Sequence, residues 1–512
     1  MGTSLIHSYL RETGRDLATA EPGFLAYLAN LDMVAQRSSS VAAAIVAELR
    51  DQRANLKLIA SENYCSLPVQ CAMANLLTDK YAEGVPANRF YAGCDNVDRI
   101  EELARQQACL LFGAEHAYVQ PHSGADANLI AYWAILSKRI ETPALAELGA
   151  TSIDTLSAAD WNALRERLGN QRLLGMNFYS GGHLTHGYRR NVSGRLFEAH
   201  SYSVDPQTGL LSYDEIERQA QTVRPLILLA GYSAYPRLID FSRLRQIADR
   251  VGAVLMVDMA HFAGLVAGKA FTGPYDPVPY ADVVTSTTHK TLRGPRGGLV
   301  LCRQEFAESV DKGCPLVQGG PLPHVMAAKA LCFAEALEPE FRSYAAQIVK
   351  NSRALAEALA RRGAKIVTGG TDNHLLLVNV TPFGLTGRQG ETALRECGVT
   401  LNRNAIPCNP DGTDPNGPWY TSGLRLGTAA VTTLEMLEPE MDKIAEIMLE
   451  VLKHTTPETT PKGRHKAKYA IADNAKAQAR ARVSELMRNY RLYPEIDLEF
   501  LIKSFPPEDH GA

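Results

Sequence analysis

Residues 258–298 read DMAHFAGLVAGKAFTGPYDPVPYADVVTSTTHKTLRGPRGG. The acidic Asp258 ends one apolar run, VLMV at 254–257, and the pair His289–Lys290 ends the next. Each run has the length of a buried strand, and a glycine-rich turn follows the second. Because ligands bind beyond the carboxyl ends of strands in open α/β sheets, Asp258 and Lys290 are predicted to serve one binding site.

A carboxylate and a lysine are two groups that a pyridoxal phosphate (PLP) ring requires. The carboxylate keeps the pyridine nitrogen protonated, and the lysine forms a Schiff base with the aldehyde. A desolvated lysine has a lowered pKa and becomes nucleophilic. Taken alone, however, Asp258 is equally well explained as a helix cap and Lys290 as an exposed loop lysine. The PLP hypothesis therefore requires further motifs.

A candidate phosphate site lies in HSGADAN (122–128), just before the apolar run LIAYWAIL. A Ser–Gly turn that opens a helix presents free backbone N–H groups to an anion, which predicts a phosphate cup at Ser123, Gly124 and Ala125. The alternative is an ordinary helix cap by Ser123 or Asp126.

Two further motifs offer ring and carboxylate contacts. In SGGHLTHG (180–187), an imidazole of His183 or His186 beside two glycines can stack on a flat ring, whereas the alternative is a pair of core or loop histidines. Their spacing does not by itself make a metal site, and no metal is predicted. Arg425 in TSGLRLGT (421–428) suits a bidentate carboxylate contact, with a surface ion pair as the alternative.

Short apolar runs alternate with candidate helices from residue 97 onward, which predicts an α/β fold with a mostly parallel sheet between helices. The candidate strands are 117–119, 226–230, 254–257, 283–285 and 299–301. We expect a helical arm at 1–88, a large PLP-binding domain at 89–340, a smaller αβ domain at 341–455 and an extension at 456–512. The Thr- and Pro-rich stretch 455–466 reads as an exposed linker. Apolar residues at helical spacing over 471–490 predict one docked helix.

Residues 138–170 interrupt the strand–helix rhythm and are predicted to form a helical insertion on the surface, with a helix capped by Ser157 or Asp160. A role in contacts between subunits is the alternative.

The bulk composition excludes several classes of protein. The 512 residues carry a net charge of -3, which gives no general nucleic-acid footprint. No apolar run is long enough to cross a membrane, and the polar N-terminus lacks the core of a signal peptide. The nine scattered cysteines predict reduced thiols in a cytoplasmic protein.

From about Leu56 to Leu452 the chain closely resembles the serine hydroxymethyltransferase family, which belongs to the fold-type I (aspartate-aminotransferase-like) PLP enzymes. The motifs that carry the resemblance are LIASENY (58–64), TDKYAEGVPANRFYAGC (78–94), VQPHSGADAN (119–128), GGHLTHG (181–187), VDMAHFAGLVA (257–267), TTHKTLRGPRGG (287–298), QGGPLPH (318–324), GGTDNH (369–374) and TSGLRLGT (421–428).

The resemblance implies a reversible transfer of the serine hydroxymethyl carbon to tetrahydrofolate, which yields glycine and 5,10-methylenetetrahydrofolate. It implies PLP as cofactor, tetrahydrofolate as co-substrate, and a homodimer or tetramer with shared active sites. A folate-independent PLP aldolase or amino-acid racemase is the alternative activity, and a PLP-fold protein without enzymatic activity is disfavoured by the intact set Lys290, Asp258 and His183.

The resemblance also implies residue roles. The cofactor contacts would be Lys290 as Schiff-base lysine, Asp258 at the pyridine nitrogen, His183 on the ring, Ser233 and His261 near the ring hydroxyl, Ser123, Gly124 and Ala125 at the phosphate, and Gly319 and Gly320 from a neighbouring subunit. Arg425 and Ser61 would bind the amino-acid carboxylate. Tyr81, Glu83 and Tyr91 would come from the other subunit, with Glu83 as the leading acid–base group and Tyr91 or His289 next. Asn404 and Phe178 would lie near the folate.

Two segments depart from the family pattern. Ala125 stands where many members carry a small hydroxyl residue, which removes a side-chain donor from the phosphate cup. Phe178-Tyr179-Ser180 replaces the usual Leu-Ala-His. These aromatic rings either stack on the pterin or its aminobenzoyl tail, or pack against the 138–170 insertion.

Overall fold

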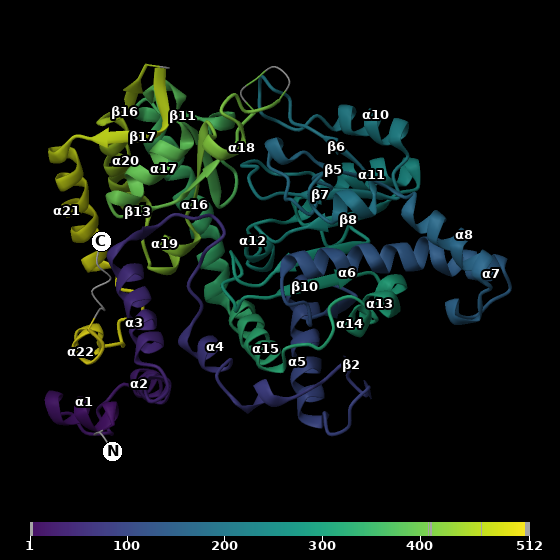
Figure 1. Ribbon diagram of the computed structural model, residues 1–512, viewed down its shortest axis with the longest axis horizontal. Helices are drawn as coiled ribbons and strands as arrows, with labels where there is room; N and C mark the ends of the chain where they lie inside the picture. The colour runs from purple at the N-terminus through teal and green to yellow at the C-terminus, as the bar shows by residue number, and fades with distance from the viewer. Residues whose placement is uncertain (1–3, 408, 410–411, 462, 507–512) are drawn as a thin grey trace.

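A seven-stranded sheet forms the centre of the computed structural model, which describes residues 4–407, 409, 412–461 and 463–506 (Figure 1). The strands lie in the order β4-β10-β9-β8-β7-β5-β6. Their bounds are β4 His116–Tyr118, β5 Arg172–Met176, β6 Glu198–Tyr202, β7 Ile227–Gly231, β8 Val254–Asp258, β9 Val283–Thr287 and β10 Gly298–Cys302. Strands β6, β5, β7, β8 and β9 run parallel, and β10 is antiparallel to both of its neighbours.

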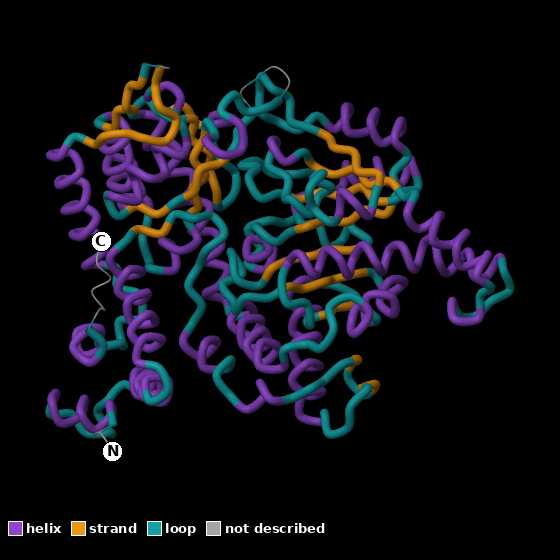
Figure 2. Tube along the Cα trace, in the orientation of Figure 1, coloured by secondary structure: helices purple, strands orange, loops and turns teal. Residues whose placement is uncertain are grey.

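Helices cover both faces of this sheet (Figure 2). Alternate strand residues enter different cores: Leu255 and Val257 join one cluster, and Val254 and Met256 join another. The helices on the first side are α5 Asp95–Phe112, α10 Tyr213–Val223, α11 Phe241–Val251, α12 Ala263–Ala267 and α15 Pro323–Leu337, and those on the second are α6 Gly124–Leu136 and α13 Gln304–Asp311. Burial on both faces explains why the central strands read as continuous apolar runs. The predicted mostly parallel α/β fold is confirmed.

A smaller antiparallel sheet, in the order β11-β12-β15-β14, lies beside the large one. Its strands are β11 Lys365–Ile366, β12 Leu375–Asn379, β14 Asn402–Asn404 and β15 Gly423–Gly427. Its core also takes side chains from both ends of the chain. The helices that share it are α1 Leu5–Thr13, α2 Pro22–Ala35, α3 Ser39–Ala54, α16 Pro339–Arg361, α17 Gly387–Glu396, α20 Glu438–Lys453, α21 Asp473–Asn489 and α22 Leu498–Ser504. The two termini therefore pack on one body.

The expected linker at 455–466 is instead part of a hairpin, formed by β16 Thr455–Thr460 and β17 Gly463–Ile471. Threonine is β-branched and favours strands, and this preference outweighs the turn signal of the prolines. The docked helix α21 is confirmed, with Ala475, Ala479 and Val483 buried. Ile471 ends β17 and Tyr490 lies just beyond α21, so the helix is shorter than expected. Helix α22 was not predicted.

The 138–170 insertion forms helices α7 Thr142–Glu147 and α8 Ala158–Gly169, which continue beyond α6 as a projecting arm at the right of Figure 1. The Ser157 hydroxyl accepts a hydrogen bond from the Asp160 N–H at 3.2 Å and caps α8. The predicted helices of this segment and the predicted cap at Ser157 are therefore confirmed.

The remaining short elements complete the chain. They are β1 Leu56–Lys57, β2 Gly84–Val85, β3 Asn88–Arg89, β13 Val399–Thr400, α4 Leu67–Cys71, α9 Ser193–Leu196, α14 Gly313–Leu316, α18 Gly417–Tyr420, α19 Ala429–Thr433, single turns at Leu76–Asp79, Ile153–Thr155, Phe178–Ser180, Gly273–Tyr275, Val367–Gly369 and Thr381–Phe383, and a π-turn at Ser137–Glu141. The eight described cysteines are free, and Cys408 lies outside the described residues. Among the described helices, none combines the length and the apolar character needed to cross a bilayer.

Candidate active site

A cavity of about 490 Å³ opens at the carboxyl ends of β7, β8 and β9. This is the edge at which ligands bind in sheets of this kind. The predicted site residues that line it are Ser61, Ser123, Gly124, Ala125, His183, Ser233, Asp258, His261, His289, Lys290 and Arg425. The fold therefore brings together eleven residues that are spread over more than 360 positions of the chain.

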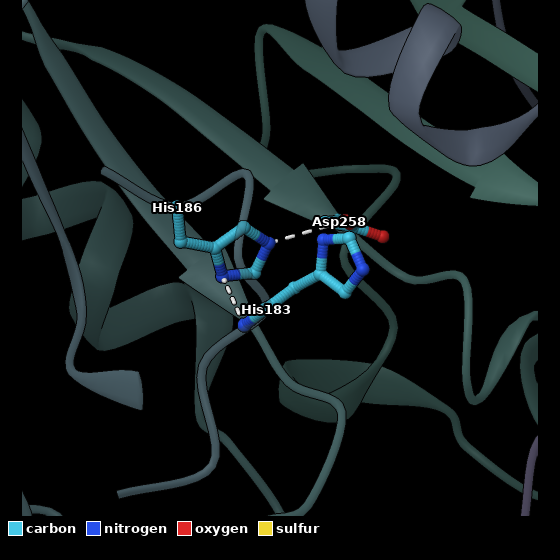
Figure 3. A group of neighbouring side chains, drawn as sticks. All are labelled: His183, His186 and Asp258. Atoms are coloured by element: carbon cyan, nitrogen blue, oxygen red, sulfur yellow. Dashed lines mark hydrogen bonds and ion pairs between the residues drawn. The ribbon is translucent and has the colours of Figure 1, made fainter. Parts of the chain in front are cut away.

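Asp258 ends β8, lines the cavity and is 7% exposed; Figure 3 shows it beside His183 and His186. Its Oδ2 accepts hydrogen bonds from His186 Nε2 at 3.1 Å and Asn128 Nδ2 at 2.9 Å, and its Oδ1 accepts one from the Ala260 N–H at 3.0 Å. Burial disfavours the carboxylate, but the hydrogen bonds from His186 and Asn128 lower the pKa of Asp258 below its usual range. Helix α12 begins only at Ala263, so Asp258 is a buried anion and not a helix cap.

Lys290 follows β9 and is buried, with 9% of its surface exposed. Burial is the main cause that lowers the pKa of its amine to about 8, and the positive charges of Arg425 and Arg296 act in the same direction. The Asp258 carboxylate opposes the shift. The alternative of an exposed loop lysine is therefore wrong, and a useful fraction of the amine is neutral and nucleophilic near neutral pH.

Ser123 is the N-cap of α6 and also lines the cavity. Its hydroxyl accepts from the Asp126 N–H at 3.2 Å, and its carbonyl accepts from the Ala127 N–H, so it caps α6. The N–H groups of Gly124 and Ala125 in the first turn remain available at the cavity wall, where the helix dipole favours an anion. A Cβ on Gly124 would lie 2.7 Å from a Thr287 methyl carbon, so glycine permits the close approach of α6 to β9.

Arg425 points from β15 of the small sheet into the same cavity. Its Nη1 donates to the Ser233 carbonyl at 2.6 Å, and its Nε donates to Asn402 Oδ1 at 3.0 Å. Burial lowers the pKa of Arg425 to about 10, so the guanidinium stays cationic at neutral pH. Both contacts fix the guanidinium without neutralising it, which leaves a cation for a carboxylate ligand.

Several residues that support the site were not predicted. They are Asn128, Thr185, Thr285, His374 and Asn402. His374 is fully buried and its Nε2 lies 3.2 Å from His261 Nδ1. Asn128 lies in the motif HSGADAN and His374 in GGTDNH, and Asn402 begins β14. Polar side chains of this kind carry no local signal of their own.

Seven residues expected at the site do not line the cavity. They are Tyr81, Glu83, Tyr91, Phe178, Gly319, Gly320 and Asn404. The Tyr81 hydroxyl donates a hydrogen bond to Glu83 Oε1 at 3.3 Å, and the centroids of the Tyr81 and Tyr91 rings lie 4.7 Å apart. A Cβ on Gly320 would lie 3.6 Å from Tyr81, so Gly320 belongs with Tyr81, Glu83 and Tyr91 to a second cluster, outside the lining of this chain's own cavity. Glu83 makes no ion pair with Lys80 or Arg89.

Phe178 and Asn404 belong to two segments outside the cavity lining. The centroid of the Phe178 ring lies 5.6 Å from that of Tyr179 and 5.2 Å from that of Tyr188, and both tyrosines belong to the same loop. Asn404 ends β14, and its side chain donates to the Ala405 carbonyl at 2.7 Å.

The residues that line the cavity fit PLP. A buried lysine, a buried carboxylate and a helix N-terminus meet at one cavity, and the buried His289 Nδ1 has no hydrogen-bond partner within the described part of the chain. His183, His186 and Asp258 also bring potential metal ligands within 4.8 Å of one another. Because His186 and Asp258 already hydrogen-bond to each other through these atoms, the arrangement favours a hydrogen-bonded network over a metal site.

Comparison with known proteins agrees with this chemistry. The family model described as serine hydroxymethyltransferase matches residues 34–152 and 154–448. A serine hydroxymethyltransferase of Treponema pallidum is 59% identical over 512 residues, which cover 100% of this chain and 88% of the relative. A relative of that name from Cutibacterium acnes is 56% identical over 488 residues, which cover 95% of this chain and 98% of the relative. One from Chlamydia trachomatis serovar D is 49% identical over 501 residues, which cover 98% of this chain and 100% of the relative. The chain belongs to the serine hydroxymethyltransferase family.

Proposed function

We propose that the cavity around Lys290 interconverts serine plus tetrahydrofolate with glycine plus 5,10-methylenetetrahydrofolate. Membership of the family supports the reaction, and one observation carries the assignment of the site: the buried Asp258 anion and the buried Lys290 amine face the same cavity as the α6 N-terminus. These groups match the pyridine nitrogen, the aldehyde and the phosphate of PLP.

PLP, when bound, supplies the electron sink that stabilises negative charge on the Cα of the amino acid. Asp258 would hold a proton on the pyridine nitrogen, and the Gly124 and Ala125 N–H groups would bind the phosphate. His183 would lie against the ring. Lys290 would hold the aldehyde carbon and, once released, carry a proton near Cα.

Arg425 and Ser61 would bind the carboxylate of serine or glycine. Because the guanidinium is held at two atoms by Ser233 and Asn402, the carboxylate would dock in one orientation. By holding the carboxylate, Arg425 would decide which bond at Cα breaks. Phe178 and Asn404 would contact the folate, with the Phe178–Tyr188 ring pair offering an aromatic surface outside the cavity.

We propose that the active unit is a homodimer in which Tyr81, Glu83, Tyr91, Gly319 and Gly320 complete the partner's cavity. Large exposed apolar side chains support this. They are Leu76, Tyr81, Phe90, Tyr91, Leu103, Leu110, Leu316, Leu322 and Leu331, on or beside α5 and α15, which pack against each other. Clusters of this kind mark protein interfaces.

The free cysteines support a reducing, cytoplasmic setting.

Serine cleavage measured with and without tetrahydrofolate tests the reaction. We expect cleavage to require tetrahydrofolate, and Glu83→Gln to reduce it by at least about a hundredfold because the carboxyl group manages protons at the departing oxygen. Cleavage of a β-phenyl hydroxy amino acid, which needs no folate, should fall less and serves as the control. Equal serine cleavage without tetrahydrofolate would identify a folate-independent aldolase.

The pH dependence of PLP capture by the cofactor-free chain tests the environment of Lys290. Only the neutral amine attacks an aldehyde, so the capture rate should rise with pH up to about 8 and then level off. Asp258 raises the pKa of this amine, so Asp258→Asn should move the plateau to lower pH. Stopped-flow absorbance gives the rates, and a plateau reached only near the ordinary lysine pKa of 10.5 would contradict the buried environment.

Mixing two inactive variants tests the shared site. Lys290→Ala and Glu83→Ala protomers, unfolded and refolded together, should form mixed dimers in which one of two sites has both residues intact. Random pairing makes half the dimers mixed, so about a quarter of the wild-type activity should return. Mixed dimers that form, as shown by two distinct affinity tags, yet remain inactive would overturn the shared-site proposal.

A further inference from the structure

A chain of hydrogen bonds leads from Asp258 to His183, and the direction of each bond can be assigned. Because a carboxylate only accepts, Asn128 must present its NH₂ group to Asp258 Oδ2, at 2.9 Å. This orientation turns Asn128 Oδ1 toward Thr285, whose hydroxyl donates to it at 2.5 Å. The amide of Asn128 therefore has one possible orientation.

The second N–H of the Asn128 amide is directed at Thr185 Oγ1, at 2.7 Å. Thr185 Oγ1 accepts this bond, so its own proton is free to donate to His183 Nδ1, also at 2.7 Å. The Thr185 backbone N–H points at the same nitrogen from 3.2 Å. Two donors thus converge on His183 Nδ1, and a proton on that nitrogen would face both of them.

The His186 ring is fixed by the same logic. Its Nδ1 accepts from the His183 backbone N–H at 3.3 Å, so its proton lies on Nε2 and is donated to Asp258 (Figure 3). His186 is therefore a neutral ring with both nitrogens engaged. The negative charge of Asp258 is not cancelled by an imidazolium at this position.

We propose that Asn128 and Thr185 are positioning residues that lock His183 as a neutral imidazole with its only proton on Nε2. This inference deepens the proposed function. A locked His183 offers a flat neutral face and one N–H donor to the cavity, and it has no free lone pair with which to remove a proton from the substrate. Proton removal then falls to other groups of the completed site.

The charges around His183 agree with the neutral form. The titratable or charged groups that act on it from the packed elements are His186 on its own loop, Asp258 at the end of β8, Lys290 after β9 and Arg425 on β15. Burial is the main cause that lowers the pKa of His183 to about 4, with Lys290 and Arg425 acting in the same direction and Asp258 opposing them. The hydrogen bonds add a geometric reason, because protonation requires Nδ1 to become a donor.

Nitrogen NMR of the holoenzyme carrying ¹⁵N-labelled histidine tests the lock directly. His183 is assigned among the 13 histidines by the signals lost in His183→Gln. We expect Nδ1 to show the shift of an unprotonated nitrogen and Nε2 that of an N–H, unchanged from pH 6 to pH 8.5. A proton on Nδ1 in the wild-type protein, or titration of the ring within this range, overturns the proposal without reference to activity.

Two substitutions at one position identify the source of the lock. Thr185→Val keeps the shape but removes the hydroxyl that donates to Nδ1, so part of the proton of His183 should move to Nδ1 and the two nitrogen shifts should move toward each other. Thr185→Ser restores the donor and should restore both wild-type shifts. If Thr185→Val keeps the wild-type nitrogen shifts, Thr185 does not position His183. If the wild-type protein shows the expected nitrogen shifts but does not turn over serine, the proposed reaction is wrong and the positioning of His183 is not.

Discussion

A buried carboxylate without a cationic partner organises the active site. An ionised group that leaves water loses several kcal/mol of solvation, so Asp258 can remain charged only where donors surround it. His186, Asn128 and the Ala260 N–H supply three, and they come from a loop, from α6 and from the turn after β8. The requirement to satisfy this anion therefore fixes three separate segments relative to the sheet.

Two glycines allow backbone segments of the site to approach each other closely. A Cβ on Gly231, at the end of β7, would lie 2.0 Å from the Asp258 carbonyl oxygen, and one on Gly175 in β5 would lie 2.7 Å from the His186 carbonyl oxygen. Both contacts are too close for any side chain. Parallel pairing places Asp258 opposite Thr285 of β9, so Lys290, five residues further on, reaches the same cavity. Charge and strand register together set the site.

The sequence predicted the parts of this site whose signal is local. Asp258 and Lys290 end apolar runs, and the Ser123 turn precedes a helix, so strand and helix patterns alone placed them at one sheet edge. Asn128 and Thr185 could not be predicted this way, because their partners lie 130 and 57 positions away in the sequence and neutral side chains show no periodicity. The roles of Tyr81, Glu83 and Tyr91 rest on family resemblance, since one chain leaves them outside its own cavity. The sequence patterns did not predict strands β5 and β6. Strand β6 is half-exposed and polar, so it shows no apolar run, and β5 directly follows the 138–170 segment, where the alternation of strands and helices is interrupted.

Direct observation of the cofactor's pyridine nitrogen tests the central claim that the Asp258 anion governs the site. PLP labelled with ¹⁵N in its ring can be bound to the wild-type protein and to Asp258→Asn, which keeps the shape and removes the charge. We predict a protonated nitrogen in the wild-type protein across neutral pH and an unprotonated one in Asp258→Asn. The same protonation state in both proteins, or an unprotonated nitrogen in the wild-type protein, would contradict the account.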